Sequence, residues 1–329
     1  MYVLAFDLWS RRQLCDTACS SNQRECIVDE QSFISGRQTG QTISWHARSL
    51  ERSNACCIYC GTFLRGTNPP ESDKEHLIAR NFVPTGMMDG QPFNFIFRAC
   101  RICNARKAAA ERHVSSVTLF NSPARLENQE VNDAAIRKGQ GDFHPQQRGV
   151  RIADSQVSLS IARSFGPMSV DFEMVGPPQL DRGLVGEVAL SHIQGLFALI
   201  CTEDYRDPQK MRLLPQDQVI WFDCYAHEDW GNPKAREIAD RVQSWDCHAN
   251  IDSAQGYFKA ILRRNDQGWF WALEWNRYLR LLGGIGDKSM RLFDGLPDEG
   301  WSSTPKGRMR RNVPLDPLHD SLFAADVHD

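Results

Sequence analysis

The sequence that decides the fold is Cys57-Ile-Tyr-Cys60, followed thirty-nine residues later by Cys100-Arg-Ile-Cys103. Two residues separate the cysteines of each pair, and two such pairs supply the four sulfur ligands of a tetrahedral zinc site. We therefore expect these four cysteines to bind a structural zinc ion. Cys56 is the alternative to its neighbour, but the spacing favours Cys57. The long interval between the pairs exceeds that of a minimal zinc ribbon and predicts a small module within it.

The composition is that of a soluble protein without a membrane segment. The chain has 329 residues, enough for about two domains with cores of their own. Its net charge is -3, so any attraction to nucleic acid has to come from a local basic patch. The cysteine count is odd, the N-terminal residues do not resemble a signal peptide, and no window approaches eighteen consecutive apolar residues. Thiolate-bound zinc in a reducing cytoplasm is the expectation.

The pattern along the chain predicts an α+β fold in five segments. Residues 1–50 form a poorly defined N-terminal extension, and residues 51–120 form the zinc-stabilised module, with a helix that begins near Cys103. Residues 121–149 are polar, contain prolines and glycines, and are expected to be a linker. Residues 150–297 alternate strand and helix patterns and predict a separate α+β domain for recognition, oligomerisation or regulation. Residues 298–329 are expected to be a flexible tail.

Three local signals in the third segment are specific. The alternating residues 157–161 and the apolar stretch 169–175 predict strands. Asn232 followed by Pro233 predicts the start of a helix, whose apolar stripe ends at Trp245. Asn265-Asp-Gln-Gly268 predicts a hairpin turn. Three tryptophans lie on one face of the strand that follows, and we expect them in the core rather than stacked on bases: Trp269, Trp271 and Trp275.

Further residues of reactive type lie between and after the two cysteine pairs. Glu75-His76 comes first, then Asn94, and Asn104-Ala-Arg-Lys107 follows the second pair directly. In this order, over about residues 54–118, the motifs resemble those of the HNH endonucleases, which have a zinc-binding ββα-metal fold. The resemblance covers about a fifth of the chain. It implies an enzyme that hydrolyses the phosphodiester bonds of DNA.

Each residue type has a task in that reaction. Attack by water on an anionic phosphodiester requires a base to remove the proton and a cation to neutralise developing charge. His76 titrates near neutral pH and is the expected base. The resemblance assigns Asn94 to orienting the imidazole ring. It also makes Glu75 and Asn104 ligands of a catalytic divalent metal, and their hard oxygen atoms suit Mg²⁺ or Mn²⁺.

Basic residues gather around the second cysteine pair. Five lie within fifteen positions: Arg98, Arg101, Arg106, Lys107 and Arg112. A helix that carries them can lie along a phosphate backbone, and a solvated helix face is the alternative. Beside the expected catalytic residues we favour contact with nucleic acid. His113 on the same helix is expected to contact DNA or to lie on the surface.

The sequence thus predicts a metal-dependent DNA endonuclease, with restriction, phage defence and mobile-element spread all open as biological roles. A non-catalytic, zinc-stabilised nucleic-acid-binding protein or adaptor is the alternative, although such a protein needs neither His76 nor Asn94. DNA is the expected partner, and no membrane is. Cleavage of both strands favours a homodimer, for which the Trp-rich hairpin and the stripe ending at Trp245 are the available apolar surfaces. Since the chain has no Walker A motif, ATP-dependent action needs a partner subunit such as an ATPase.

Overall fold

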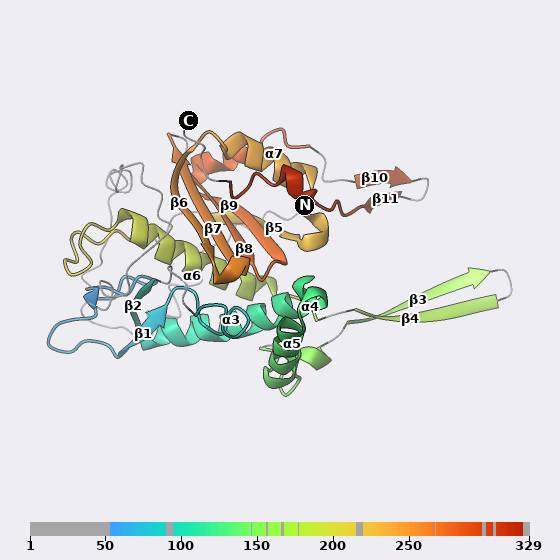
Figure 1. Cartoon of the computed structure of the whole chain (residues 1–329), viewed down its shortest axis with the longest axis horizontal. Coiled ribbons are helices and arrows are strands. Elements are labelled where there is room, and N and C mark those ends of the chain that lie inside the picture. The colour runs from blue at the N-terminus through green and yellow to red at the C-terminus, as the bar shows by residue number, and fades with distance from the viewer. Residues whose placement is uncertain are drawn as a thin grey trace.

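The structure is a computed structural model of the chain. It describes residues 53–89, 95–145, 147–155, 157–165, 168–176, 178–214, 220–266, 268–297, 301–304 and 307–324. Helices pack on antiparallel sheets, which confirms the predicted α+β class (Figure 1). The N-terminal extension expected over residues 1–50 lies outside the described residues.

Two antiparallel strands and a helix form the unit that carries both cysteine pairs, called the ββα unit below. β1 (Ser72–His76) pairs with β2 (Ile96–Cys100), so that Glu75 lies opposite Phe97. The helix α3 (Arg101–Asn121) begins at the residue that follows β2. Its buried positions Ala110, Val114 and Val117 recur at helical spacing and form the face that packs against the rest of the chain.

A five-stranded antiparallel sheet, in the order β5-β9-β8-β7-β6, occupies the second half of the chain. The hairpin predicted at Asn265–Gly268 is confirmed, because β7 and β8 pair across this turn. The strands are β5 (Ile220–Ala226), β6 (Asp246–Ser253), β7 (Phe258–Asn265), β8 (Gly268–Trp275) and β9 (Leu279–Ile285).

The two faces of this sheet contribute to two different cores. On β8 the odd-numbered residues, including Trp269, Trp271 and Trp275, belong to the larger core, and Phe270 and Ala272 belong to the smaller one. Side chains alternate between faces along a strand, so this division follows from the strand itself. The tryptophans are therefore core residues, as predicted, and are not a free surface for a dimer.

Each core has a helix packed on the sheet. The smaller core lies under α7 (Pro233–Val242), whose N-cap Asn232 accepts a hydrogen bond from the backbone N–H of Lys234, as the sequence predicts. Trp245 is buried there as well. The larger core contains α6 (Arg182–Cys201), which packs on α3 and also on the sheet.

The larger core is shared between the ββα unit and the sheet. It joins Phe97 of β2, Phe197 of α6 and Trp271 of β8 in one cluster. After β8, the Asn276 side chain donates hydrogen bonds to the carbonyl oxygen of Phe82 at 3.1 Å and to Oγ1 of Thr118 at 2.8 Å. The division into domains stays a prediction, but the ββα unit and the five-stranded sheet are packed together.

The stretch expected as a linker is largely helical. It contains α4 (Ala124–Glu127) and α5 (Gln129–Gly141). The side chain of Asn128 caps α5 by accepting from the backbone N–H groups of Glu130 and Val131. Gly139 is inside this helix, where a Cβ atom would lie 3.4 Å from that of Ala153. The glycine thus permits close helix packing and does not form a turn.

The stretch expected as a flexible tail packs on the sheet over residues 311–324. Nη1 of Arg280 on β9 donates to Oδ1 of Asp320 at 3.1 Å, and Leu322 is buried in the smaller core. Before this segment, β10 (Trp301–Thr304) pairs with β11 (Gly307–Arg310). The 3-10 helices are η2 (Ile152–Asp154), η3 (His227–Asp229), η4 (Ala254–Gly256), η5 (Asp287–Phe293) and η6 (Pro317–His319).

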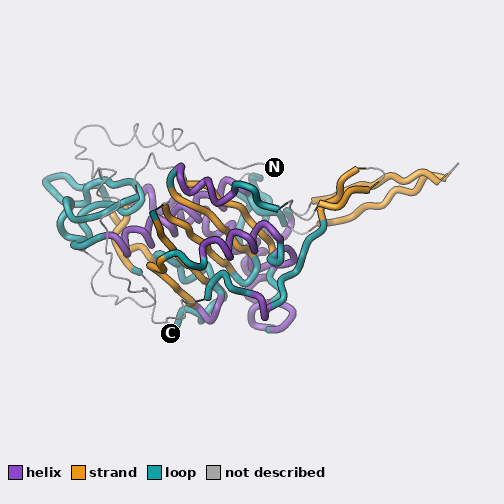
Figure 2. The backbone as a smooth tube through the Cα atoms, turned by 90° about the horizontal axis from the view of Figure 1, so that it is seen from above, coloured by secondary structure: helices purple, strands orange, loops and turns teal. Residues whose placement is uncertain are grey.

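The strands predicted in the third segment form a separate hairpin. β3 (Val157–Phe165) and β4 (Met168–Gly176) pair antiparallel along their whole length. This hairpin extends away from the body of the molecule in both views (Figures 1 and 2).

Among the described residues, α6 alone has the length and apolar character of a membrane span, with a mean hydropathy of 1.6. Of that window 83% is buried inside the fold, as in the core helix of a soluble protein. A cytoplasmic location stays a prediction.

Candidate metal centre and catalytic residues

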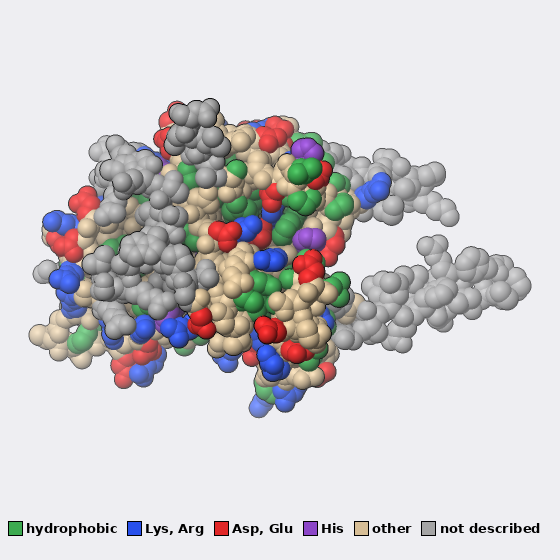
Figure 3. Space-filling model, in the orientation of Figure 1, with side chains coloured by type: hydrophobic (Ala, Val, Ile, Leu, Met, Phe, Trp, Pro, Cys, Tyr) green, Lys and Arg blue, Asp and Glu red, His purple; other side chains and the backbone are tan. Residues whose placement is uncertain are grey.

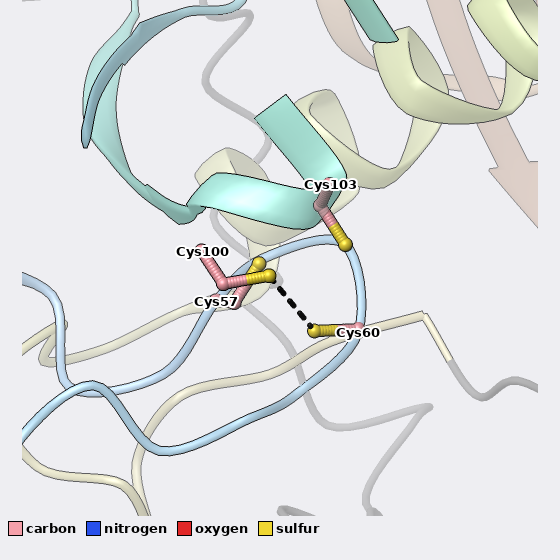
Figure 4. A group of neighbouring side chains, drawn as sticks. All are labelled: Cys57, Cys60, Cys100 and Cys103. Carbon is pink, nitrogen blue, oxygen red and sulfur yellow. Dashed lines mark hydrogen bonds between the residues drawn. The ribbon is translucent and has the colours of Figure 1, made fainter. Parts of the chain in front are cut away.

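The four cysteines predicted to bind zinc lie together. Cys57 and Cys60 come from the loop before β1, Cys100 ends β2 and Cys103 lies in the first turn of α3 (Figure 4). All four sulfur atoms lie within 4.8 Å of one another, and those of Cys60 and Cys100 are 3.7 Å apart. Zinc–sulfur bonds of about 2.3 Å would place tetrahedral ligands about 3.8 Å apart. The cluster therefore fits a zinc ion.

Local hydrogen bonds hold the first cysteine pair against β2. The N–H of Gly61 donates to the carbonyl of Cys57 at 2.8 Å, and Gly61 has a φ of +74°, which favours glycine. Asn54, only 1% exposed, accepts from the N–H of Arg98 at 2.7 Å and donates to that residue's carbonyl at 2.9 Å. It also donates to the carbonyl of Cys56 at 2.8 Å. Cys57, and not Cys56, is the residue in the sulfur cluster.

The closeness of the sulfur atoms shifts their pKa values in opposite directions. The pKa of Cys60 is lowered, first by its hydrogen bond with Cys100, and that of Cys100 is lowered, first by its hydrogen bond with Cys103. The pKa values of Cys57 and Cys103 are raised, in each case first by the hydrogen bond with Cys100. The shifts favour the thiolate form at Cys60 and Cys100 relative to Cys57 and Cys103. A cation that binds four thiolates would release the protons that the sulfur atoms still carry.

Glu75, expected to bind the catalytic metal, is 7% exposed and its carboxylate is bound by two groups of the protein. Nζ of Lys107 donates to Oε1 at 2.6 Å, and Oη of Tyr59 donates to the same oxygen at 3.2 Å. Tyr59 lies between the cysteines of the first pair, whereas Lys107 lies on α3. The carboxylate thus joins the cysteine loop, strand β1 and helix α3.

Lys107 was predicted to contact nucleic acid, but it is buried inside the protein. Its side chain is 1% exposed, and Nζ also donates to Oε1 of Glu111 at 2.8 Å and to the carbonyl oxygen of His76 at 3.1 Å. A buried ammonium with three acceptors inside the protein cannot reach a phosphate at the surface. Oε1 of Glu111 in turn lies 3.4 Å from Nε2 of His192 on α6.

In the cluster of Lys107, Glu75 and Glu111, burial and the neighbouring charges shift the pKa values in opposite directions. Burial lowers the pKa of Lys107, but the carboxylates of Glu111 and Glu75 outweigh it and raise the pKa overall. Burial raises the pKa of Glu111, but Lys107 and His192 outweigh it, so that carboxyl has a lowered pKa. For Glu75, burial raises the pKa and Lys107 only partly compensates. The two carboxylates thus favour the charged form of Lys107 against the effect of burial.

The other expected catalytic residues are less enclosed. His76 ends β1 and is half-buried, and Asn104, in the first turn of α3, is half-buried as well. Adjacent residues of a strand point to opposite faces, which agrees with a buried Glu75 beside a more accessible His76. Asn94 lies outside the described residues.

The remaining basic residues are spread over different environments. Arg112 is exposed and Arg106 is half-buried on α3. Arg101 is exposed and pairs with Glu71 and Asp73. The guanidinium of Arg98 bonds Ser72, with Nε donating to Oγ at 3.0 Å. On the face drawn in Figure 3 the described basic and acidic side chains are interspersed.

His113 was expected at the surface or on DNA, and this is wrong. It is 1% exposed, and its Nε2 accepts a hydrogen bond from the backbone N–H of Asp181 at 3.0 Å. Its ring also packs against that of His144 with a centroid distance of 5.2 Å. This face of α3 is covered by the turn that precedes α6.

Several residues of the site have no counterpart in the sequence analysis: Asn54, Tyr59, Glu111, His192 and Gln194. Only Glu111 has a local signal that could have identified it, its i,i+4 spacing from Lys107. The others act across long sequence separations.

Comparisons with models of protein families, with curated proteins and with solved structures find no match for this chain. The chemistry of the site has to be inferred from its own residues and their geometry. Four thiol groups close a ββα unit, an imidazole ends its first strand, and an amide lies at the start of its helix.

Proposed function

We propose that this chain is a metal-dependent endonuclease of the HNH type that hydrolyses phosphodiester bonds of DNA. The observation that carries the proposal is the ββα unit closed by the four-cysteine cluster, with His76 ending β1 and Asn104 in the first turn of α3. An imidazole base beside oxygen ligands for a divalent cation is what hydrolysis of a phosphodiester needs.

In this proposal His76 takes the proton of the attacking water. Two backbone contacts hold the end of β1: the carbonyl of His76 accepts from Nζ of Lys107 at 3.1 Å, and the N–H of Leu77 donates to the carbonyl of Phe95 at 2.8 Å. A base held in place loses less activity to misorientation, because small displacements of a reacting group slow a reaction strongly. His76 is half-buried as a residue, and its Nε2 is buried, so the proton would have to pass to Nδ1 or to an Nε2 that becomes accessible when DNA binds.

The metal would be held by the carboxylate of Glu75 and the amide oxygen of Asn104. A divalent cation there would neutralise charge on the phosphate and on the leaving oxygen. One carboxylate and one amide form a hard-oxygen donor set of the kind that Mg²⁺ or Mn²⁺ takes together with phosphate and water. Lys107 and Tyr59 fix the Glu75 carboxylate through hydrogen bonds to Oε1. The ammonium of Lys107 also balances part of the negative charge of this carboxylate.

DNA would approach over the accessible arginines of α3, Arg101, Arg106 and Arg112, which supply salt-dependent affinity for phosphate. A homodimer or an association with a partner subunit such as an ATPase stays a prediction. Since Trp245 and the tryptophans of β8 are buried within one chain, a dimer would have to use other surfaces.

The test is cleavage of a supercoiled plasmid by wild type and by His76→Ala, each with and without Mg²⁺ or Mn²⁺. Wild type should cut only with a divalent metal, and His76→Ala should not cut while keeping its zinc content and thermal midpoint. Cleavage by His76→Ala at the wild-type rate would remove His76 from the mechanism.

One observation favours the alternative of a zinc-stabilised nucleic-acid-binding protein or adaptor. The Glu75 carboxylate already has a cationic partner in Lys107. A carboxylate whose charge is balanced by a lysine has no need of a metal ion. In the same experiment that alternative predicts a shifted plasmid band through binding, without nicked or linear product under any metal condition. An adaptor predicts neither binding nor cleavage.

A further inference from the structure

One turn of α6 contacts three separate parts of the candidate site. The residues are His192, Gln194 and Gly195, and all three are buried. They lie far along the chain from the motif, in the segment expected to serve recognition, oligomerisation or regulation.

His192 reaches the ion cluster. Its Nε2 lies 3.4 Å from Oε1 of Glu111, which accepts from Lys107, which in turn donates to Glu75. The imidazole is confined by three aromatic rings at centroid distances of 5.3 to 5.6 Å: Phe82, Phe258 and Trp275. A ring held on several sides fixes the carboxylate of Glu111 and, through Lys107, that of Glu75.

Gln194 reaches the first cysteine pair. Its Nε2 donates to the carbonyl oxygen of Tyr59 at 3.2 Å. Tyr59 lies between Cys57 and Cys60, and its hydroxyl donates to Glu75. This hydrogen bond therefore connects α6 to the cysteine loop and, through Tyr59, to the same carboxylate.

Gly195 approaches the residue that follows the expected base. A Cβ atom at Gly195 would lie 2.3 Å from Cδ1 of Leu77 and 3.5 Å from its Cγ. A non-bonded contact below 3.0 Å is too short for a Cβ atom, so a side chain at Gly195 would force the Cδ1 methyl group of Leu77 to move. Leu77 is fully buried and directly follows His76. Glycine thus allows α6 to support the end of β1.

We propose that α6 is part of the catalytic apparatus, with His192, Gln194 and Gly195 acting as positioning residues for Glu75, the first cysteine pair and His76. The proposal rests on the endonuclease function proposed above and assigns a task in catalysis to a helix outside the motif. None of the three residues needs to touch the substrate. Each fixes a group that does, or one that holds the ββα unit together.

The decisive variant is Gly195→Ala in the full-length chain. The new methyl group forces the side chain of Leu77 to repack, and because Leu77 is fully buried and directly follows His76, the repacking should disturb the end of β1. We therefore expect kcat for plasmid cleavage to fall at least about tenfold with KM for DNA unchanged. Leu77→Ala removes the colliding atoms, so the double variant should cut faster than Gly195→Ala alone. Ser191→Ala is the matched control on the same helix, because its hydroxyl donates to the carbonyl of Glu187 one turn earlier at 2.8 Å.

A spectroscopic measurement makes the result independent of cleavage. In histidine-labelled protein, the NMR signal that His76→Ala removes should shift in Gly195→Ala, move back in the double variant and stay in place in Ser191→Ala. A folded Gly195→Ala protein with wild-type kcat and an unmoved His76 signal would overturn the proposal. If wild type does not cut DNA, the proposed function fails, and the His76 signal still decides whether α6 positions this residue.

Gln194→Ala provides the second test in case Gly195→Ala does not fold. It removes the hydrogen bond to the cysteine loop and leaves the cysteines intact. Zinc should pass to a chelator faster than from wild type, and Ser191→Ala should release it at the wild-type rate. An unchanged rate of zinc release in Gln194→Ala would count against the positioning of the cysteine loop by α6.

Discussion

Nζ of Lys107 lies 2.6 Å from Oε1 of Glu75, and both side chains are almost wholly buried. In a buried ion pair, the attraction between the charges is largely offset by the cost of removing both charges from water. The pair therefore adds little net stability to the fold. Its importance is that the lysine cannot be removed alone without leaving two buried carboxylates, those of Glu75 and Glu111, without a cation. Helix α3 and strand β1 are therefore held in one relative position by a contact that tolerates little change.

Removing this lysine should be strongly destabilising. Lys107→Met leaves the carboxylates of Glu75 and Glu111 buried without a cation, and we expect the free energy of unfolding at neutral pH to fall by about 3–5 kcal/mol. Lys74→Met, at an exposed position of the same unit, should change it by less than about 0.5 kcal/mol. Urea unfolding measures both. Adding Glu75→Gln to Lys107→Met should recover part of the loss, and no recovery would argue against the pairing.

The cysteine cluster should hold about one zinc ion per chain through purification. Cys103→Ser should lose the zinc and most of the soluble folded protein, because zinc binding contributes directly to folding. Cys224→Ser, an exposed cysteine outside the cluster, should keep both. Elemental analysis of the purified proteins gives the answer. Folded wild type without zinc would be incompatible with this assignment.

The buried His113 should make the protein less stable in acid. Burial lowers its pKa to about 4, the charge of His144 lowers it too, and Asp181 acts against them. An unfolded histidine titrates near 6.5, so between about pH 6.5 and 4 the unfolded chain binds the proton more readily. The free energy of unfolding then falls as the pH falls through this window, by up to about 3 kcal/mol.

The variant for this prediction is His113→Gln, which keeps an acceptor for the Asp181 N–H and removes the titrating group. Its free energy of unfolding should fall less between pH 7 and pH 4.5 than that of wild type, as measured by urea unfolding at the two pH values. An equal fall in both proteins would show that other groups control the acid sensitivity.

The packing of residues 311–324 depends on a glycine. A Cβ atom at Gly231 would lie 2.4 Å from the carbonyl oxygen of Pro314, and Gly231 also donates its N–H to the carbonyl of Val313 at 2.8 Å. Because backbone cannot give way as a side-chain tip can, Gly231→Ala should cost about 1–3 kcal/mol. Thermal unfolding measures this cost. Gly86→Ala is a poor control because its φ is positive, whereas Gly141→Ala meets open space and suits the comparison.

The features that the sequence predicted are those set by local chemistry. Cysteine spacing predicts the cluster, because a pair two residues apart can bind one ion whatever surrounds it. Asn232 and Pro233 predict the start of α7 by their own backbone preferences. The alternation of Trp269, Trp271 and Trp275 predicts one buried face of β8, because the period of a strand is two residues.

What could not be predicted depends on residues that are distant in sequence. Lys107 looks like any other basic residue of α3, and only the approach of Glu75 and Glu111 makes it a buried charge. Gly139 suggested a loop, but its neighbour Ala153 makes it a packing residue of α5. The burial of His113 follows from the turn before α6, which no pattern around His113 reveals.

The long separations within the site have a consequence for how the protein is made. Gln194 and Tyr59 are 135 residues apart, and Asn276 and Phe82 are 194 apart. Because a ribosome releases the chain from its N-terminal end, both cysteine pairs and α3 emerge well before α6 and the β8–β9 turn. Contacts between such distant residues form slowly and only once both have emerged. A nascent chain thus contains the entire motif before the residues that support it. For a protein proposed to cut DNA, we expect no activity until α6 and the β8–β9 turn have emerged.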